Sequence, residues 1–337
     1  MAVSTPPTKL PHATDFTDDL RLAHVLADDA DSLAMARFKA LDLHVMTKPD
    51  LTPVTDADKA IEDGIRRTLS RARPRDAVYG EEGGSTGSSS RRWVVDPIDG
   101  TKNFVRGVPV WASLISLMID DEVVVGVVSA PALNRRWWAM KDGGAWTGKS
   151  LLRATRCQVS DVSRIEDASL AYSSLGGWDS RGRLDEFLAL TRCVWRTRAY
   201  GDFWSYMLLA EGAVDIATEP ELALHDMAAL DVIVREAGGI ATSLEGEPGP
   251  LGTSYLATNG KLHDQALAFL GEVDDTRFGP QILAAREAAE DAASDSMGSV
   301  HDLAARRRAL FGDPEELTSD SGLRPVLALA WMHVEDQ

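Results

Sequence analysis

Acidic residues follow several apolar stretches of this chain, at places where distant segments could bring them together. In residues 93–104, WVVDPIDGTKNF, Asp96 and Asp99 come after a strand-like run and flank a Pro-Ile pair. Trp93–Val95 predicts a buried strand, because aromatic and β-branched residues suit an enclosed sheet, and Pro97 is expected to end it. Carboxylates beside free backbone N–H groups favour a metal and phosphate site over an ordinary core.

Two further acids, Glu81 and Asp226, lie at the ends of predicted elements in GEE (residues 80–82) and HDMAALDVIVREAGG (residues 225–239). A hard divalent cation such as Mg²⁺ prefers oxygen ligands, usually a few carboxylates, water and phosphate. A pair of cations about 3.5–4 Å apart needs at least one shared carboxylate. Asp226, in the first turn of its helix, could close such a site from a second direction.

The Asp-Pro-Ile-Asp segment could supply much of this ligand set. The Ile98 carbonyl lies between its two carboxylates, and Gly100 and Thr101 open a turn or helix whose N–H groups could hold phosphate oxygens. Alone, each acid is more often a cap or a solvated charge. The hypothesis therefore depends on the acids gathering in space.

Two amphipathic helices are expected before these acids. The helical spacing of Leu and Ala predicts a helix from Thr17 to about Phe38, with Thr17 as its N-cap. Thr55-x-x-Asp58 resembles a capping box that opens a second helix, ending near Ser70.

The remaining pattern mixes strands and helices without a strict βαβ repeat. Strands are expected at 41–46 and 78–82, with a Gly/Ser surface linker at 83–90, and a hairpin or meander follows, with turns at Asp120-Asp121 and Asp142-Gly143-Gly144. Later helices are predicted near 183–191, 202–211, 225–237 and 260–270. The fold class is therefore α/β (α+β), layered, with largely antiparallel sheets.

Composition narrows the classes of function. The formal net charge of −17 argues against a protein that relies on nucleic-acid phosphates. The longest apolar run, residues 108–119, is too short to span a bilayer, and the first residues lack the pattern of a secretory signal. Cys157 and Cys193 form no metal-like spacing and indicate no disulfide framework. A cytoplasmic enzyme is the expected class.

The charge also indicates how the chain is divided. Residues 272–337 hold 14 acidic and 6 basic residues, a net −8, which is nearly half of the total imbalance. We expect a flexible leader at 1–15, a catalytic domain at 16–271 with halves of about 16–150 and 151–271, and an acidic, mostly helical extension at 272–337. That extension could be a helical cap, a partner-binding appendage or a loosely attached tail.

The three motifs GEE, WVVDPIDGTKNF and HDMAALDVIVREAGG resemble the signatures of the inositol monophosphatase family, in the same order and at roughly the same spacing. The resemblance covers about residues 16–271. It implies an alternating αβαβα sugar-phosphatase-like fold, dependence on Mg²⁺ with two or three ions per site, and hydrolysis of small phosphate monoesters.

Carried onto the matching positions, the resemblance implies two sets of cation ligands. The first Mg²⁺ would be bound by Glu81, Asp96 and the Ile98 carbonyl. The second would be bound by Asp96, Asp99 and Asp226. No side chain need become phosphorylated, since the cations activate water and neutralise charge on the leaving oxygen.

The resemblance also implies catalytic and phosphate-binding residues. Glu81 and Thr101 would orient the attacking water, with Thr101 tied to Asp56. Lys48 is either near the phosphate or a solvated loop lysine. Gly100 and Thr101 are expected to hold the substrate's phosphate oxygens, and Asp99 and Asp226 are also expected to bind the substrate.

Within the family, Lys102 and Arg106 resemble the actinobacterial type of histidinol-phosphate phosphatase. Histidinol carries an imidazole and an ammonium group, so its pocket should offer acids and an aromatic wall. Asp202 and Glu219 stand where family members contact the alcohol half of the ester, and Tyr200 could flank the ring, although Asp202 could instead cap its helix. Hydrolysis of L-histidinol phosphate in histidine biosynthesis is the function that this resemblance implies.

Two other functions remain open. One is an inositol monophosphatase or broad sugar-phosphate phosphatase with the same mechanism. The other is a catalytically silent, metal-binding partner protein that uses the acidic tail. For the enzyme, the expected partners are a small phosphorylated substrate and a second copy of the chain, with no nucleic acid and no membrane.

The third motif departs from the family at one position. Where the family usually has Trp before the metal-binding aspartate, this chain has His225. His225 could support Asp226 or fill the gap left by the Trp, and we expect the latter.

Overall fold

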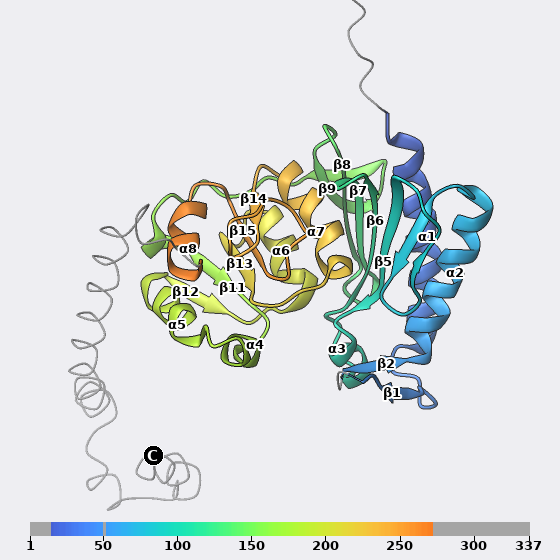
Figure 1. Ribbon diagram of the computed structural model, residues 1–337, viewed down its shortest axis with the longest axis horizontal. Coiled ribbons are helices and arrows are strands. Elements are labelled where there is room, and N and C mark those ends of the chain that lie inside the picture. The colour runs from blue at the N-terminus through green and yellow to red at the C-terminus, as the bar shows by residue number, and fades with distance from the viewer. Residues whose placement is uncertain (1–14, 50–51, 272–337) are drawn as a thin grey trace, which may run out of the picture. The chain divides into compact units, whose positions relative to one another are not determined.

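Two β-sheets and the helices around them make up the part of the chain that the computed structural model describes, residues 15–49 and 52–271 (Figure 1). These residues belong to a single compact unit. The predicted leader, apart from Asp15, and the predicted extension at 272–337 lie outside the described residues.

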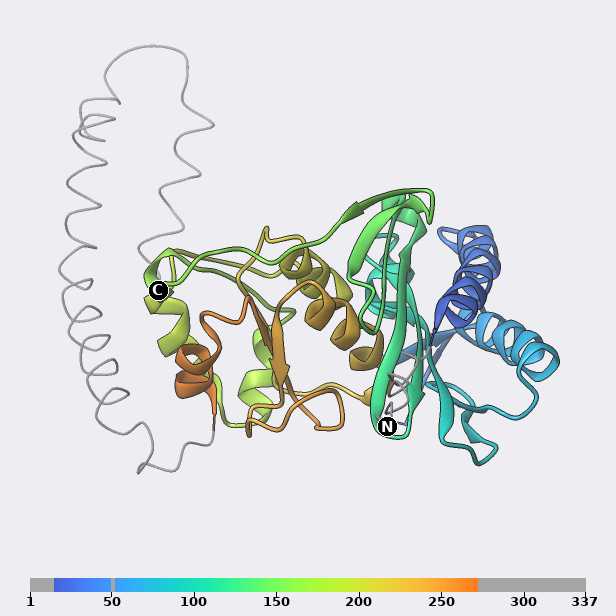
Figure 2. The same cartoon turned by 90° about the horizontal axis from the view of Figure 1, so that it is seen from above.

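Helices α1 (Thr17–Arg37) and α2 (Asp56–Ala72) pack against each other and against one face of the larger sheet (Figures 1 and 2). Thr55 caps α2 through a capping box with Asp58, as predicted. The predicted N-cap of α1 is wrong: Thr17 is its first helical residue and Phe16 precedes it, because the Asp15 carboxylate already accepts the Thr17 N–H.

The larger sheet has the strand order β10-β9-β8-β7-β6-β5-β3-β4. All neighbouring strands are antiparallel except β3 and β5, so the expected meander with tight turns is confirmed. The strands are β3 (Ala77–Gly80), β4 (Gly84–Thr86), β5 (Arg91–Asp99), β6 (Ala112–Ile119), β7 (Glu122–Ala130), β8 (Arg135–Met140), β9 (Ala145–Ser150) and β10 (Arg153–Arg156).

Helix α7 (Leu224–Glu236) covers the other face of this sheet and also contacts α6 (Asp202–Ala210). Gly126 on β7 makes the close approach possible. A Cβ at this position would lie 2.5 Å from Val232 Cγ1 and 2.8 Å from the Ala229 carbonyl oxygen. Because α7 carries Asp226 in its first turn, this packing brings an acid from late in the chain to the first sheet.

The second sheet has the order β12-β11-β13-β15-β14 and mixes parallel with antiparallel pairs. Helices α6 and α7 contact it from the side of the first sheet, and α8 also contacts it. The layers therefore alternate as αβαβα, which confirms the predicted fold class (Figures 1 and 2). The elements are β11 (Ser169–Ala171), α4 (Leu175–Ser180), α5 (Leu184–Cys193), β12 (Arg196–Arg198), β13 (Ile216–Glu219), β14 (Ile240–Thr242), β15 (Tyr255–Thr258) and α8 (His263–Leu270).

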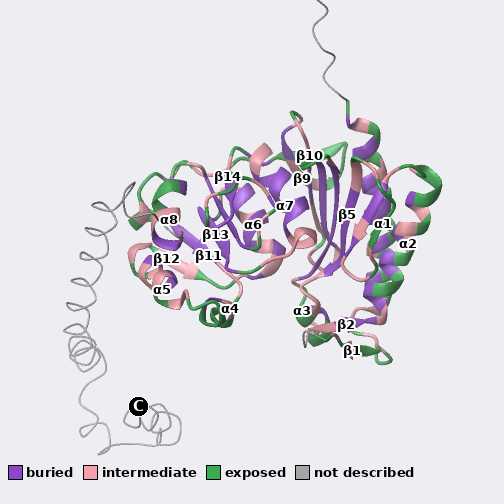
Figure 3. Ribbon diagram, in the orientation of Figure 1, coloured by how far each residue is buried: buried purple, intermediate pink, exposed green. Residues whose placement is uncertain are grey.

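The apolar core follows from this layering. One cluster of buried side chains lies between the first sheet and α1 and α2, and the other joins that sheet to α6 and α7. Figure 3 shows the buried residues concentrated in the strands and in the helices between the sheets. The strands of the first sheet are thus enclosed on both faces, as the nearly continuous apolar runs of β6 and β7 require.

Two further local predictions were wrong. The strand expected at 41–46 is only β1 (Val45–Thr47), paired with β2 (Pro53–Thr55), because residues 41–42 form a turn. The supposed Gly/Ser linker at 83–90 contains β4, whose backbone pairs with β3 despite its polar side chains.

Candidate active site

Strand β5 does not stop at Pro97. It runs on to Asp99 through a bulge, since Asp96 pairs with Leu114 and Asp99 with Ala112. Proline is tolerated there because a bulge leaves one residue outside the ladder. The prediction that Pro97 ends the strand was wrong, and the extra residue is what lets the strand carry both acids at its end.

Asp99 also holds the second half of the domain to this strand. Its Oδ2 accepts the backbone N–H of Phe203 in the first turn of α6, at 2.7 Å. Gly100 follows at φ +83°, a conformation that favours glycine, and a Cβ there would lie 3.0 Å from the Val110 carbonyl oxygen. The chain then enters α3 (Thr101–Arg106), the predicted turn or helix after Gly100.

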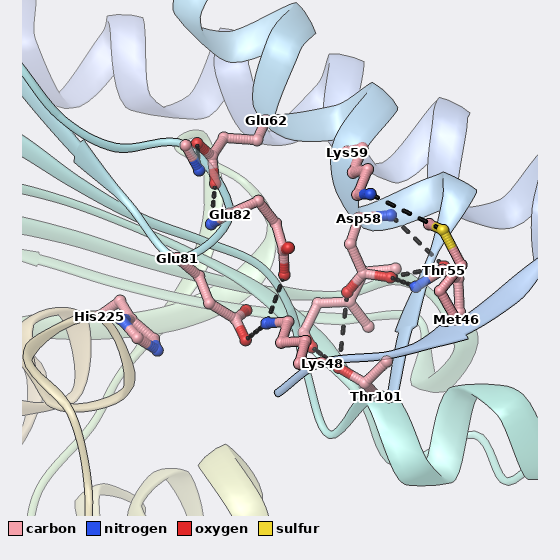
Figure 4. A network of polar contacts seen from close by, with 12 residues as sticks. Met46, Lys48, Thr55, Asp58, Lys59, Glu62, Glu81, Glu82, Thr101 and His225 are labelled. Carbon is pink, nitrogen blue, oxygen red and sulfur yellow. Dashed lines mark hydrogen bonds and ion pairs between the residues drawn. The ribbon is translucent and has the colours of Figure 1, made fainter. Parts of the chain in front are cut away.

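Glu81 and Glu82 lie just beyond the end of β3. The Glu81 N–H donates to the Val95 carbonyl at 3.2 Å, while the N–H groups of Glu82 and Gly83 donate to the buried Glu62 carboxylate on α2. The Lys48 ammonium bridges the two acids, 2.5 Å from Glu81 and 2.6 Å from Glu82 (Figure 4). Glu62, which shapes this turn, gave no signal in the sequence.

The four predicted acids come together from three elements. Oxygens of Asp96, Asp99 and Asp226 lie within 4.8 Å of one another, and ligand atoms of Glu81, Asp96 and His225 form a second group of the same size. Asp96 belongs to both groups, as a carboxylate shared between two cations must. A third group, Asp58, Glu81 and Glu82, adjoins them.

Lys48 pairs with Glu81, but no ion pair to a basic side chain is found for Asp96 or Asp99 among the described residues. Burial, followed by the charges of neighbouring carboxylates, raises the pKa of Asp96 and of Asp99 well above the usual range. Asp96 is only 2% exposed, and its Oδ1 has no hydrogen-bond partner. A buried carboxylate oxygen without a donor, among other acids, fits a site for a divalent cation.

Thr101 contacts Asp58 and not Asp56, which corrects the predicted pair. The Thr101 hydroxyl lies 2.9 Å from the Ile98 carbonyl oxygen and 3.5 Å from Asp58 Oδ1. Asp56 instead forms an ion pair with Arg37 at 2.7 Å. Both acids occur in the same VTDAD stretch, but Asp58 is the capping-box residue, and its side chain turns back over Thr55 toward α3 (Figure 4).

Burial also shifts the pKa of Asp58. Loss of solvent, together with the charges of Glu81 and Glu82, raises the pKa of Asp58 to about 6, against the effect of the hydrogen bonds from Thr55. The group therefore changes its protonation state close to neutral pH, which suits a proton acceptor.

The predicted residues for the alcohol half of the substrate lie on the second half of the domain. Asp202 Oδ2 accepts a hydrogen bond from Asn103 Nδ2 at 2.8 Å. Gly201 is the N-cap of α6 and Asp202 makes no side-chain cap, so the capping alternative was wrong. Burial raises the pKa of Asp202 to about 6, and the charge of Asp226 adds to this rise.

Glu219, on β13, is 7% exposed, and its Oε1 has no hydrogen-bond partner. Burial raises its pKa to about 8, although hydrogen bonds from Ser173 oppose the shift. Tyr200 packs edge-on against Trp204, with ring centroids 5.7 Å apart. Asn103 and Ser173, which hold these acids, were not predicted from the sequence.

An apolar hollow of about 270 Å³ lies elsewhere, between the start of α1 and strands β8–β10. Its lining includes Leu20, Trp138, Trp146 and Leu152 and contains no acid or histidine. It is therefore separate from the acidic cluster. No helix within the described residues has the length and apolar character needed to cross a membrane.

Comparison with known proteins shows close relatives. A model of the inositol monophosphatase family matches residues 18–273. The histidinol-phosphatase of Streptomyces coelicolor is 64% identical over 262 residues, covering 77% of this chain and 98% of the relative. The histidinol-phosphatase of Mycobacterium tuberculosis is 61% identical over 254 residues, covering 75% of this chain and 98% of the relative.

Solved structures show the same fold. An inositol monophosphatase from Zymomonas mobilis superposes with a TM-score of 0.68 at 31% identity, covering 77% of this chain and 99% of that one. The extragenic suppressor protein SuhB from Bartonella henselae superposes with a TM-score of 0.69 at 29% identity, covering 76% and 99% of the two chains.

Proposed function

This chain belongs to the inositol monophosphatase family, and from that premise we propose that it is a Mg²⁺-dependent phosphatase that hydrolyses L-histidinol phosphate to L-histidinol and phosphate. The proposal depends most on the gathering of Asp96, Asp99 and Asp226, with ligand oxygens within 4.8 Å. The two histidinol-phosphatases that share more than 60% of their residues with this chain support the choice of substrate.

We assign the acids to cations as follows. Asp96, Asp99 and Asp226 would hold one Mg²⁺, and Glu81, Asp96 and the Ile98 carbonyl would hold another. The adjoining group of Asp58, Glu81 and Glu82 is the candidate for a third ion, which would take the place of the Lys48 ammonium between the two glutamates. When bound, such cations supply Lewis acidity that polarises a phosphoryl oxygen and offsets the charge developed during phosphoryl transfer.

The protein's own groups would position a water for attack on phosphorus. A hydroxyl has one proton and two lone pairs. When the Thr101 hydroxyl donates its hydrogen bond to the Ile98 carbonyl oxygen or to Asp58, its oxygen is free to accept a hydrogen bond from water. Asp58, with its pKa near 6, can then take up a proton along this route. Glu81 adds a second acceptor on the other side.

The residues around the substrate would divide between its two ends. Gly100 and Thr101 offer backbone N–H groups to the phosphate, beside Asp99 and Asp226. Asp202 and Glu219 would complement the ammonium and imidazole of histidinol, with Tyr200 along the ring. Lys48, which bridges Glu81 and Glu82, would balance their charge as well as approach the phosphate.

The site of action and the assembly are also proposals. We infer that the enzyme works in the cytoplasm and that it forms a homodimer. Both inferences rest on the family resemblance. Light scattering on the purified full chain would test the dimer. A monomer at micromolar concentration would contradict it.

The decisive experiment measures phosphate released from L-histidinol phosphate, inositol 1-phosphate and a panel of sugar phosphates. Each is assayed with Mg²⁺, and again after chelation with EDTA. We expect hydrolysis only with the cation, and the highest kcat/KM for histidinol phosphate. A preference for inositol phosphate would keep the mechanism and replace the substrate.

An inositol monophosphatase is the alternative favoured by a specific observation, the superposition on the Zymomonas mobilis enzyme. A catalytically silent metal-binding protein would need to release no phosphate from any ester of the panel. The presence of all four acids argues against that reading.

A further inference from the structure

His225 lies at the mouth of the acidic cluster. It is the second residue of α7, directly before Asp226, and its side chain is 15% exposed. In Figure 4 its ring points toward the Glu81 carboxylate. A ring nitrogen of His225 and oxygens of Glu81 and Asp96 lie within 4.8 Å of one another.

Neither ring nitrogen is committed to another group among the described residues. Nδ1 is buried and has no hydrogen-bond partner. Nε2 lies 3.5 Å from Asp226 Oδ1, which is too long for a strong hydrogen bond. The His225 ring also packs against the Tyr79 ring, with the centroids 6.2 Å apart, but this contact uses neither ring nitrogen.

One oxygen of the facing Asp96 carboxylate is also without a partner. Asp96 is only 2% exposed, so water cannot easily reach it, yet its Oδ1 receives no hydrogen bond. Two residues that each carry a buried, unpartnered polar atom therefore bring ligand atoms within 4.8 Å of each other and of Glu81. Neutral imidazole offers one lone pair to a cation.

We propose that His225 gives an imidazole nitrogen to the cation held by Glu81 and Asp96, so that this position has a mixed nitrogen and oxygen ligand set. The proposal rests on the proposed function, since it concerns one of its cation positions. Imidazole suits Zn²⁺ and the later transition ions best. Mn²⁺ is usually bound by oxygen, but as a transition ion it accepts an imidazole nitrogen more readily than Mg²⁺, which prefers oxygen ligands alone. The cation position held by Glu81, Asp96 and His225 should therefore favour Mn²⁺ over Mg²⁺ more strongly than an all-oxygen site does.

The test uses the full chain loaded with Mn²⁺ and measured by pulsed electron paramagnetic resonance. Nitrogen bound to Mn²⁺ modulates the electron spin echo through its ¹⁴N nucleus. We expect ¹⁴N modulation in the wild type and its loss in His225→Trp, which keeps an aromatic ring against Tyr79, and in His225→Gln. His44→Gln is the matched control, because His44 is exposed and belongs to no possible ligand group in the described part of the chain. It should retain the signal.

Affinity gives a second readout. In titrations with Mn²⁺ and with Mg²⁺, His225→Trp should lose roughly tenfold in Mn²⁺ affinity and clearly less in Mg²⁺ affinity. An unchanged ratio of the two affinities, or a wild-type spectrum without ¹⁴N modulation, would overturn the inference.

The two proposals can fail separately. Cation-dependent hydrolysis without ¹⁴N modulation would remove the role of His225 and leave the phosphatase intact. Modulation without hydrolysis of any phosphate ester would support the ligand and remove the proposed function. Circular dichroism of each variant excludes unfolding as the cause of a lost signal.

Discussion

The two ends of strand β5 bury carboxylates in opposite ways. At its start, Arg91 lies 2.8 Å from Asp19 and 3.3 Å from Asp76, and Arg73 lies 3.1 Å from Asp19. Trp93 Nε1 also donates to Asp76 at 3.0 Å. At the other end of the strand, Asp96 and Asp99 face each other and further acids, with no guanidinium beside them among the contacts described.

Burial alone therefore does not distinguish a structural acid from a functional one. The side chains of Asp19 and Asp76 are 11% and 6% exposed, comparable to the acids of the cluster. What differs is the partner. Paired acids stabilise the fold, since removing either partner leaves a buried charge, whereas clustered acids store repulsion that a cation can relieve. The predictions below compare the two ends of the strand.

The largest effect is expected at the clustered end. Asp96→Asn should lower turnover by roughly 10³-fold or more, because it removes the ligand that the two proposed cation positions share. It should not lower the free energy of unfolding, since it removes a buried charge that its neighbours repel. Phosphate release and urea denaturation measure the two quantities.

Asp19→Asn is the control for Asp96→Asn at the paired end. It should lower the free energy of unfolding by about 2 kcal/mol and leave turnover within about threefold. The contrast fails if Asp96→Asn unfolds the protein or keeps its activity.

The next effect separates the two aspartates of the VTDAD stretch. Asp58→Asn should lower kcat by roughly 10²-fold, because the proposed proton acceptor next to Thr101 is lost. Asp56→Asn, whose partner is Arg37, should change kcat by less than about threefold. Steady-state kinetics on both variants measure this, and a larger loss in Asp56→Asn would restore the original pairing with Thr101.

A smaller effect is expected for Arg91→Gln. Asp19 would keep Arg73 and Asp76 would keep Trp93, so the free energy of unfolding should fall by only about 2 kcal/mol. Turnover of the folded fraction should be unchanged. A folded but inactive variant would show that the two ends of β5 are coupled.

The smallest effect concerns a third way of burying a titratable group. Burial, and then the charge of Arg136, lowers the pKa of His24 from 6.5 to about 4, so the native imidazole stays neutral. As the pH falls from 6.5 to about 4, the unfolded chain binds a proton that the native chain does not, and stability decreases. Allowing for partial exposure, this loss should amount to about 1–2 kcal/mol.

His24→Phe keeps a ring against Trp138 and removes the titration. As the pH is lowered from 6.5 to 4, the unfolding free energy of the wild type should therefore fall relative to that of His24→Phe. His44→Gln, at an exposed position, should show no such shift. A parallel pH dependence for wild type and His24→Phe would contradict the prediction.

Local patterns predicted much of the fold and part of the site. The capping box at Thr55, the turns of the meander and the helix from His225 to the Gly pair follow from contacts within a few residues, and the structure confirms them. Predictions that depended on partners distant in sequence were less reliable. The bulge at Pro97 requires β6 beside it, and the pairing of Thr101 with Asp58 requires α2 and α3 to meet.

The sequence by itself determined which residues are the candidates for the chemistry: acids at element ends, in three motifs with the order and spacing of a known family. It also determined the periodicities that make those elements, since these depend on neighbouring side chains. Only the tertiary structure decided which acids meet, which are neutralised by arginine, and that His225 joins them. Those outcomes depend on helix and strand packing between residues distant in sequence, 54 and 72 positions apart for the arginine pairs of Asp19 and more than a hundred for His225 and Asp226.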